Sequence, residues 1–162
     1  MENLETYKEI VEAAIFTLGV DASVCRTDEP GKWNLHRGQA QIFLMLRKSK
    51  NHLGEEKDTL IMVSPIISIP QREKTRHKLL DYLLKISHQL ILETFSIAVE
   101  SDGKEVAYLS STCFIAQKSI DEIASMLDSL SFYAYKFQQE MEEAFSSKTQ
   151  GESQIQPFML EE

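Results

Sequence analysis

Residues that build metal centres and catalytic groups are scarce in this sequence. It contains two cysteines and four histidines among 162 residues, and the histidines are scattered. The motifs that arrange such residues for chemistry are missing too. There is no glycine-rich phosphate loop, no paired-cysteine zinc spacing, no His-Glu-x-x-His helix and no Gly-x-Ser-x-Gly elbow. We therefore expect no metal site, no cofactor and no enzymatic activity.

Long apolar runs and a leader segment are also lacking. No stretch approaches the roughly 18 uninterrupted apolar residues of a membrane span. The acidic start, Met1–Glu5, has neither the basic nor the apolar region of a secretory signal. We expect a cytoplasmic protein that does not insert into a membrane. In that setting Cys25 and Cys113 are expected to be reduced thiols buried in strands, with a disulfide between them as the alternative.

Positive charge is in deficit, with 17 Lys and Arg against 25 Asp and Glu and a net charge of −8. Such a surface repels nucleic acid and anionic lipid. One local exception is a basic cluster made by Arg47, Arg72 and Arg76 with neighbouring lysines. Part of it crowds a predicted helix start, where the helix dipole favours anions. The cluster is either a site for a small anion or acidic peptide, or a solvated helix end offset by Glu73 and Asp81.

The size and composition suit one globular domain. A content of 43% hydrophobic residues is enough to build a core that folds unaided. We predict a domain over residues 1–145, followed by a polar linker and C-terminal tail over 146–162. The tail carries a short apolar cluster, Ile155–Leu160, which is either a frayed terminus or a segment that docks into a groove.

The middle of the chain predicts a strand, a helix and a hairpin in that order. Asp58–Pro70 is rich in β-branched residues and predicts a strand with Pro65 at an edge or bulge. Apolar residues three or four apart predict a helix over Gln71–Leu92. Thr94–Val99 and Glu105–Cys113 alternate at period two around an Asp-Gly turn, which predicts a β-hairpin.

The flanking segments predict further helices and strands. A single apolar stripe predicts a first helix over Glu2–Leu18. Val20–Asp28 is predicted to be a short strand, Trp33–Arg47 to hold one or two strands around Gly38, and Lys48–Lys57 to be a polar loop. The last helix is expected to begin at the capping box Ser119-Ile-Asp-Glu122 and to continue to about residue 145.

The last helix is predicted to be apolar on more than one side. Its main stripe repeats every three or four residues, and further apolar residues lie off that stripe. We expect this helix to supply a surface for a partner or for a dimer, with the exposed face of the strands Gln41–Met45 as an alternative. The other interpretation is that the first helix packs against it within one molecule. The residues expected to line the surface are Met126, Leu130, Tyr133 and Phe137.

The order helix, three strands, helix, two strands, helix resembles the type III secretion chaperone-like fold, and within it the YbjN-like proteins. The resemblance covers about residues 1–145. The expected fold is therefore α+β, with an antiparallel five-stranded sheet and three helices. The segments that carry the resemblance are Val63-Ser-Pro-Ile66, Ile69-Pro70, Leu83-Leu84, Phe95-Ser-Ile97, Asp102-Gly103 and Ile123 through Leu127.

The resemblance implies a small, acidic, non-enzymatic cytoplasmic protein of bacterial type, commonly a homodimer. Secretion chaperones of this fold hold their effectors as extended chain on hydrophobic patches, and YbjN-like relatives have been linked to regulation or stress. We therefore expect a chaperone-like or regulatory module that holds a segment of a partner polypeptide. The alternative is a sensor of a small anionic ligand that uses the three arginines. Binding of nucleic acid is not expected.

Overall fold

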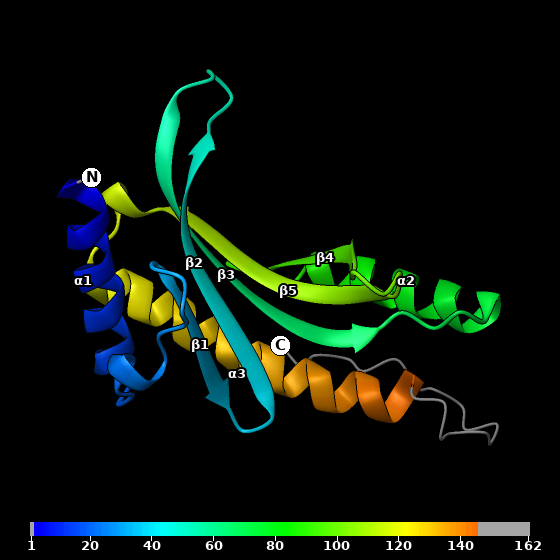
Figure 1. Cartoon of the computed structure of the whole chain (residues 1–162). Coiled ribbons are helices and arrows are strands. Elements are labelled where there is room, and N and C mark those ends of the chain that lie inside the picture. Colours follow the sequence, from blue (N-terminus) through cyan, green and yellow to red (C-terminus); the bar gives the residue numbers. More distant parts are fainter. Residues whose placement is uncertain (1, 146–162) are drawn as a thin grey trace.

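The computed structural model describes residues 2–145, which form three α-helices, five strands and two short 3-10 turns (Figure 1). The predicted tail, residues 146–162, lies outside the described residues. The elements in chain order are α1 (Glu2–Thr17), η1 (Ala22–Val24), β1 (Lys32–Arg37), β2 (Ala40–Lys50), β3 (Glu56–Ser68), α2 (Glu73–Ser87), β4 (Thr94–Val99), β5 (Glu105–Phe114), η2 (Ile115–Gln117) and α3 (Ile120–Phe145).

The described strands form one antiparallel sheet in the order β1-β2-β3-β5-β4. This confirms the predicted α+β class and the order of its elements. The central strand is β3, and its register against β5 shifts between Pro65 and Ile67. A proline has no N–H to donate to a ladder, so it sits in a central strand only at such an irregularity. Pro65 is therefore at a bulge.

One face of the sheet holds the core. Alternate residues of neighbouring strands are buried there, for example Leu44, Met62 and Leu109. The helix α3 runs along this face, and its residue Phe137 packs against Phe95 of β4 with ring centroids 5.4 Å apart. The predicted α3 stripe is entirely buried, namely Ile123, Leu127, Leu130, Ala134, Phe137 and Met141.

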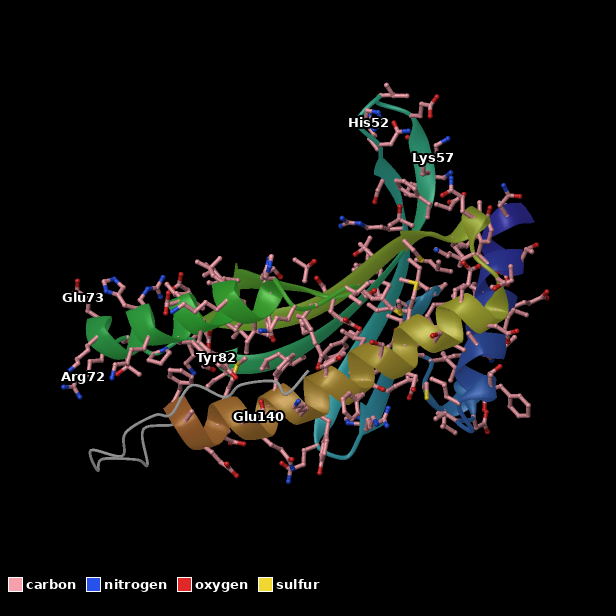
Figure 2. All side chains as sticks on the ribbon, turned by 180° about the vertical axis from the view of Figure 1, so that it is seen from behind. His52, Lys57, Arg72, Glu73, Tyr82 and Glu140 are labelled. Atoms are coloured by element: carbon pink, nitrogen blue, oxygen red, sulfur yellow. The ribbon has the colours of Figure 1, made fainter. Side chains whose placement is uncertain are left out.

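The other two helices flank α3 on the same side of the sheet. α1 packs against α3, and its Glu12 accepts a hydrogen bond of 3.2 Å from the indole N–H of the buried Trp33 in β1. At the other end, Tyr82 of α2 lies 5.9 Å from Phe145 of α3, centroid to centroid. The arrangement is two-layered. Figure 1 shows β2 passing in front of α3, and Figure 2, from behind, shows α3 in front of the sheet.

The segment 20–28 is not the predicted strand. Asp21 accepts hydrogen bonds from the backbone N–H and the hydroxyl of Ser23, which begins the short turn η1 instead. Such local side-chain bonds compete with strand pairing. One isolated bridge, between Arg26 and Trp33, remains. Cys25 therefore follows a 3-10 turn, whereas Cys113 lies in β5, and both are buried free thiols.

Two other boundaries differ from prediction. Half of the polar segment 48–57 is paired as strand, because β2 continues to Lys50 and β3 begins at Glu56. Its turn is closed by Asn51, whose side-chain oxygen accepts from two backbone N–H groups. The helix α2 ends at Ser87 rather than Leu92, where the Ser87 hydroxyl donates to the carbonyl of Leu83.

Candidate partner-binding surfaces

The face of the sheet opposite the helices has no described helix over it. On β2 and β3, the residues that alternate with the buried ones point to this side of the sheet. The apolar residues among them lie opposite one another on the two strands. Phe43 lies opposite Val63, and Met45 lies opposite Ile61. Phe43 is 38% exposed and the other three are half-buried. We call these four residues, with Tyr108 beside them on β5, the open face.

The hydroxyl of Tyr108 donates a hydrogen bond to the carboxylate of Glu100 at the margin of the open face. This bond, together with burial and the negative charge of Glu100, raises the pKa of Tyr108 to about 12. The phenol therefore stays protonated at neutral pH. It gives the apolar surface a fixed polar border.

A second apolar surface lies at the β4 edge of the sheet. Five of the six residues of β4 are exposed, and the strand contains neither proline nor charge. Large apolar residues continue from α2, which packs against β4. We call this surface the β4 patch. Its residues and their exposed fractions are Leu84 (76%), Ile91 (94%), Leu92 (46%), Ile97 (43%) and Val99 (68%).

The four residues of α3 expected to line a partner surface belong to the core instead. Met126, Leu130 and Phe137 are 8%, 0% and 1% exposed. Tyr133 is half-buried and stacks on Phe137 with centroids 5.6 Å apart. The sheet covers one stripe of α3, and α1 packs on it as well. Met126, Leu130 and Phe137 are thus covered within one molecule and Tyr133 is covered in part, so this set offers little surface to a partner.

The alternative surface, the strand segment 41–45, is accessible to a partner. Gln41, Phe43 and Met45 alternate with the buried Ile42 and Leu44 and lie on the open face. The β4 patch was missed at sequence level. The sequence predicts its strand, but nothing in the alternation of Thr94–Val99 shows that Phe95 alone would be covered and that the other residues of the strand would stay exposed.

The predicted anion site is not assembled. Arg47 lies opposite Thr59, whereas Arg72 follows the far end of β3 at Ser68. Nine residues of strand separate these points, roughly 30 Å at about 3.3 Å per residue. Figure 2 shows this separation between Arg72 at the start of α2 and the projecting β2–β3 hairpin that carries Lys57.

The third arginine of that set is already paired. The guanidinium of Arg76 holds both carboxylate oxygens of Glu105, with Nη2 3.1 Å from Oε1. This pairing lowers the pKa of Glu105 and raises that of Arg76. A bidentate pair of this kind fixes β5 to the start of α2 and leaves no cluster of three free arginines for an anion.

Residues 2–145 show no group of three or more His, Cys, Asp or Glu side chains placed to hold a metal ion. Within the same residues, each helix is too short or too polar to cross a membrane.

These features define a class by fold, an α+β domain with helices on one face of an antiparallel sheet. Two solved structures share it. A chain of the HopA1–SchA chaperone–effector complex matches with a TM-score of 0.58 and 12% identity, over 86% of this chain and 98% of that one. YbjN from E. coli matches with a TM-score of 0.58 and 9% identity, over 84% and 91%.

Those matches confirm the predicted resemblance at the level of fold. Comparison with protein-family models and with curated protein sequences gave no match. Function therefore has to be argued from the surfaces of this chain, because one fold serves many activities.

Proposed function

We propose that this protein is a chaperone-like, non-enzymatic binding module that holds an extended segment of a partner polypeptide on the open face. The observation that carries the proposal is the open face itself, where Phe43, Val63, Met45 and Ile61 form adjacent apolar pairs with no described helix over them. Burying apolar surface of this kind stabilises a complex by about 25 cal/mol of free energy per Å² removed from water.

An extended segment suits this surface better than a packed helix would. Rows of side chains on adjacent strands leave shallow grooves, and the alternate side chains of an extended chain fit them. Unfolded segments also present their apolar groups without first having to unfold. The net charge of −8 supports the same role, since it keeps a protein with exposed apolar surface soluble. The chaperone–effector complex among the structures of this fold agrees with this proposal.

We also propose that the protein is a homodimer joined through the β4 patch. An edge strand without proline or charge exposes backbone donors and acceptors that readily pair with another strand. A second copy of β4 has the same length and the same apolar character. Antiparallel pairing of the two β4 strands across a two-fold axis would therefore give hydrogen-bond partners to both strand edges at once. Both copies would then use the same surface, as an isologous interface requires.

Substitution on the open face tests the holding function. The protein is isolated from its own cells at natural abundance and examined by native mass spectrometry, together with the variants Phe43→Asp and Phe16→Asp. Phe16 is 76% exposed on α1, away from the open face, and so provides a matched control. We expect one discrete polypeptide bound to the wild type and to Phe16→Asp, and its loss from Phe43→Asp with the circular dichroism unchanged.

Salt separates this proposal from electrostatic binding. Contacts made by apolar surface persist at about 0.5 M salt, whereas exposed ion pairs weaken as the screening length shrinks to a few ångström. Release of the bound polypeptide by salt, or equal loss from both Phe variants, would contradict holding on the open face.

A further inference from the structure

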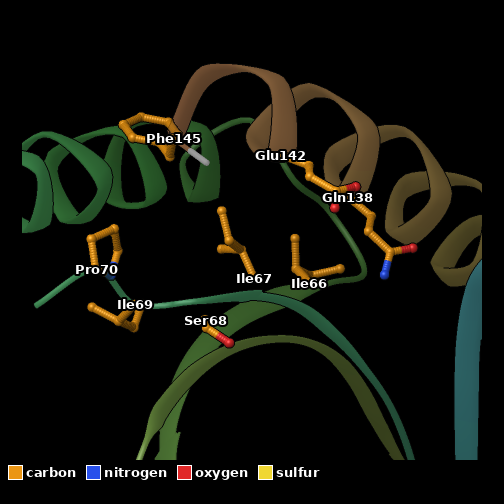
Figure 3. Close-up of a pocket in the computed structure, with 8 residues that line it drawn as sticks. All are labelled: Ile66, Ile67, Ser68, Ile69, Pro70, Gln138, Glu142 and Phe145. Carbon is orange, nitrogen blue, oxygen red and sulfur yellow. The ribbon is translucent and has the colours of Figure 1, made fainter. Parts of the chain in front are cut away.

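A cavity of about 420 Å³ lies between the end of β3 and the last turns of α3, on the helix-covered side of the sheet. Its walls include Ile66, Ile67, Ile69, Pro70 and Phe145, with Gln138 among the polar residues. Figure 3 shows Ile66 and Ile67 pointing toward α3 across this space. The bulge at Pro65 helps to form the cavity, because it places Ile67 opposite the buried Ala107 rather than on the open face.

The strand edge beside this cavity is unpaired. β2 pairs with β3 from Phe43–Val63 to Lys50–Glu56, and β2 begins at Ala40. The register therefore leaves Ile67 and Ser68 without a neighbouring strand on that side. An extended peptide can use such an edge for backbone hydrogen bonds while its side chains fill the adjacent pocket.

A buried acceptor also lacks a partner here. The side-chain oxygen of Gln138 is buried and has no hydrogen bond to any described residue. Buried polar atoms nearly always have a partner, and an unpaired one needs an explanation. Gln138 lines the cavity, and Figure 3 shows its side chain extending from α3 on the side that faces the sheet. A backbone N–H of a bound peptide would satisfy it.

Charge near the cavity favours an occupant with an acidic end. Two residues after Pro70 the chain reaches the start of α2, where Arg72, Lys74 and Lys78 are exposed. On the α3 side, Glu142 lines the cavity and would repel an anion. The occupant that fits is therefore apolar within the cavity and acidic toward α2.

We propose that the cavity binds residues Ile155–Glu162 of the same chain. Their sequence, Ile-Gln-Pro-Phe-Met-Leu-Glu-Glu, places an apolar cluster before two acidic residues, in the order that the cavity and the α2 start require. These residues lie outside the described part of the chain. The site is distinct from the open face, and the proposal does not depend on a partner being held there.

The connection is short enough for docking within one molecule. Nine residues, 146–154, join the segment to Phe145, which itself lines the cavity. A polar linker of that length has a root-mean-square span of about 15 to 18 Å. Short tethers of this kind give effective concentrations on the order of 1 mM. A segment that binds with a Kd of about 0.1 mM as a free peptide would then occupy the cavity about nine-tenths of the time.

Hydrogen exchange on the full chain tests this docking. We compare the wild type with a double variant, Phe158→Ser and Leu160→Ser, and with a control, Gln154→Ser and Gln156→Ser, that leaves the apolar cluster intact. We expect amides of residues 66–69 to exchange about tenfold faster in the first variant only, because the segment occupies the cavity about nine-tenths of the time in the wild type. The hairpin turn at 51–55 serves as an internal reference and should not change. Equal exchange in all three proteins would overturn the proposal.

A synthetic peptide then tests whether the tail segment itself causes the protection. A peptide of residues 152–162 added to the double variant should restore protection of the amides of residues 66–69, and the same peptide with Phe158→Ser should not. Tenfold dilution of the wild type should leave protection unchanged, because docking within one molecule does not depend on concentration. Loss of protection on dilution would overturn docking within one molecule and point to exchange of the segment between copies. Both substitutions lie outside residues 2–145, so a folding failure does not confuse the result.

Discussion

Gly38 lies in the β1–β2 turn, close to the ring of Tyr135 in α3. Its φ is 56°, and a Cβ added there would lie 2.6 Å from Cε2 of Tyr135. We therefore expect Gly38→Ala to destabilise the protein by about 2 to 3 kcal/mol, through the left-handed backbone and the clash together. Urea unfolding followed by circular dichroism measures the change.

Two variants separate these causes. Gly54 has a φ of 78° and nothing within 4 Å of its added Cβ, so Gly54→Ala should show only the backbone cost of about 1 to 2 kcal/mol. In a Tyr135→Ala background, the effect of Gly38→Ala should fall to that of Gly54→Ala, with a coupling energy of about 1 kcal/mol. If the cost of Gly38→Ala is the same with and without the Tyr135 ring, the contact does not contribute.

Tyr108 provides a prediction about pH. Its folded-state pKa is raised to about 12 by the hydrogen bond to Glu100, against an ordinary value of 10.0. A raised pKa means that the folded state holds the proton more tightly. The contribution of protonated Tyr108 to the free energy of unfolding is therefore fully present below pH 10 and is lost as the pH rises toward about 12. Glu100→Gln should lower this pKa toward 10.0 and weaken the loss of stability between pH 10 and 12.

Carbon NMR of the labelled tyrosine ring, assigned with Tyr108→Phe, follows this titration directly. The other tyrosines in the same spectra serve as references. A Tyr108 titration that is the same in the wild type and in Glu100→Gln would show that the bond does not hold the proton in solution.

At the scale of elements, the start of α3 depends on a reciprocal cap. The Ser119 hydroxyl accepts from the Glu122 N–H at 3.2 Å, and the Glu122 carboxylate accepts from the Ser119 N–H at 2.8 Å. Ser119→Ala should cost about 1 kcal/mol of unfolding free energy because backbone groups at the helix start lose their partner. Ser125→Ala, at an exposed position within the same helix, should change stability by less than about 0.5 kcal/mol. Equal effects of the two substitutions would show that the capping box is not formed.

The sequence predicted these elements well where one local signal dominates. Hydrophobic periodicity identified α1, α3 and the β4–β5 hairpin, and the Ser119 capping box placed the start of α3 within one residue. Prediction from the sequence failed where short-range polar contacts compete with the structure that the apolar pattern indicates. Asp21 begins a 3-10 turn over Ala22–Val24 where a strand was expected, and Asn51 closes a hairpin whose strand ends, 48–50 and 56–57, are too polar to be recognised by pattern.

The candidate site was predicted less well, for a reason that periodicity cannot overcome. An apolar stripe shows that a side chain needs cover but not whether the cover comes from the same molecule. For Leu130 and Phe137 the sheet and α1 provide it, so the expected partner surface is core. Ile97 and Val99 receive too little cover from the described residues and stay exposed. The alternating pattern of β4 gives no sign of this exposure.

At the scale of the whole molecule, the two exposed apolar surfaces lie on different parts of the sheet. The open face is made mainly by β2 and β3, and the β4 patch lies at the edge beyond β5. A dimer joined through β4 would extend the sheet and leave both open faces free. Holding a partner and pairing with a second copy are therefore compatible.

A dimer joined through the β4 patch has a defined mass. Size-exclusion chromatography with light scattering should give a mass twice the 18.6 kDa of one chain. The double variant Ile97→Glu and Val99→Glu should elute as a single chain with unchanged circular dichroism, because both side chains are already exposed, at 43% and 68%. Like charges facing each other across a two-fold axis oppose pairing.

Leu53→Glu is the matched control, since Leu53 is 70% exposed in the β2–β3 hairpin turn and lies outside the β4 patch. It should remain dimeric, and about 0.5 M salt should not dissociate the wild type if the interface is apolar. A wild type of 18.6 kDa at high concentration would contradict the β4 interface. So would a Leu53 variant that dissociates as readily as the double variant, because the effect would then come from added charge rather than from the β4 edge.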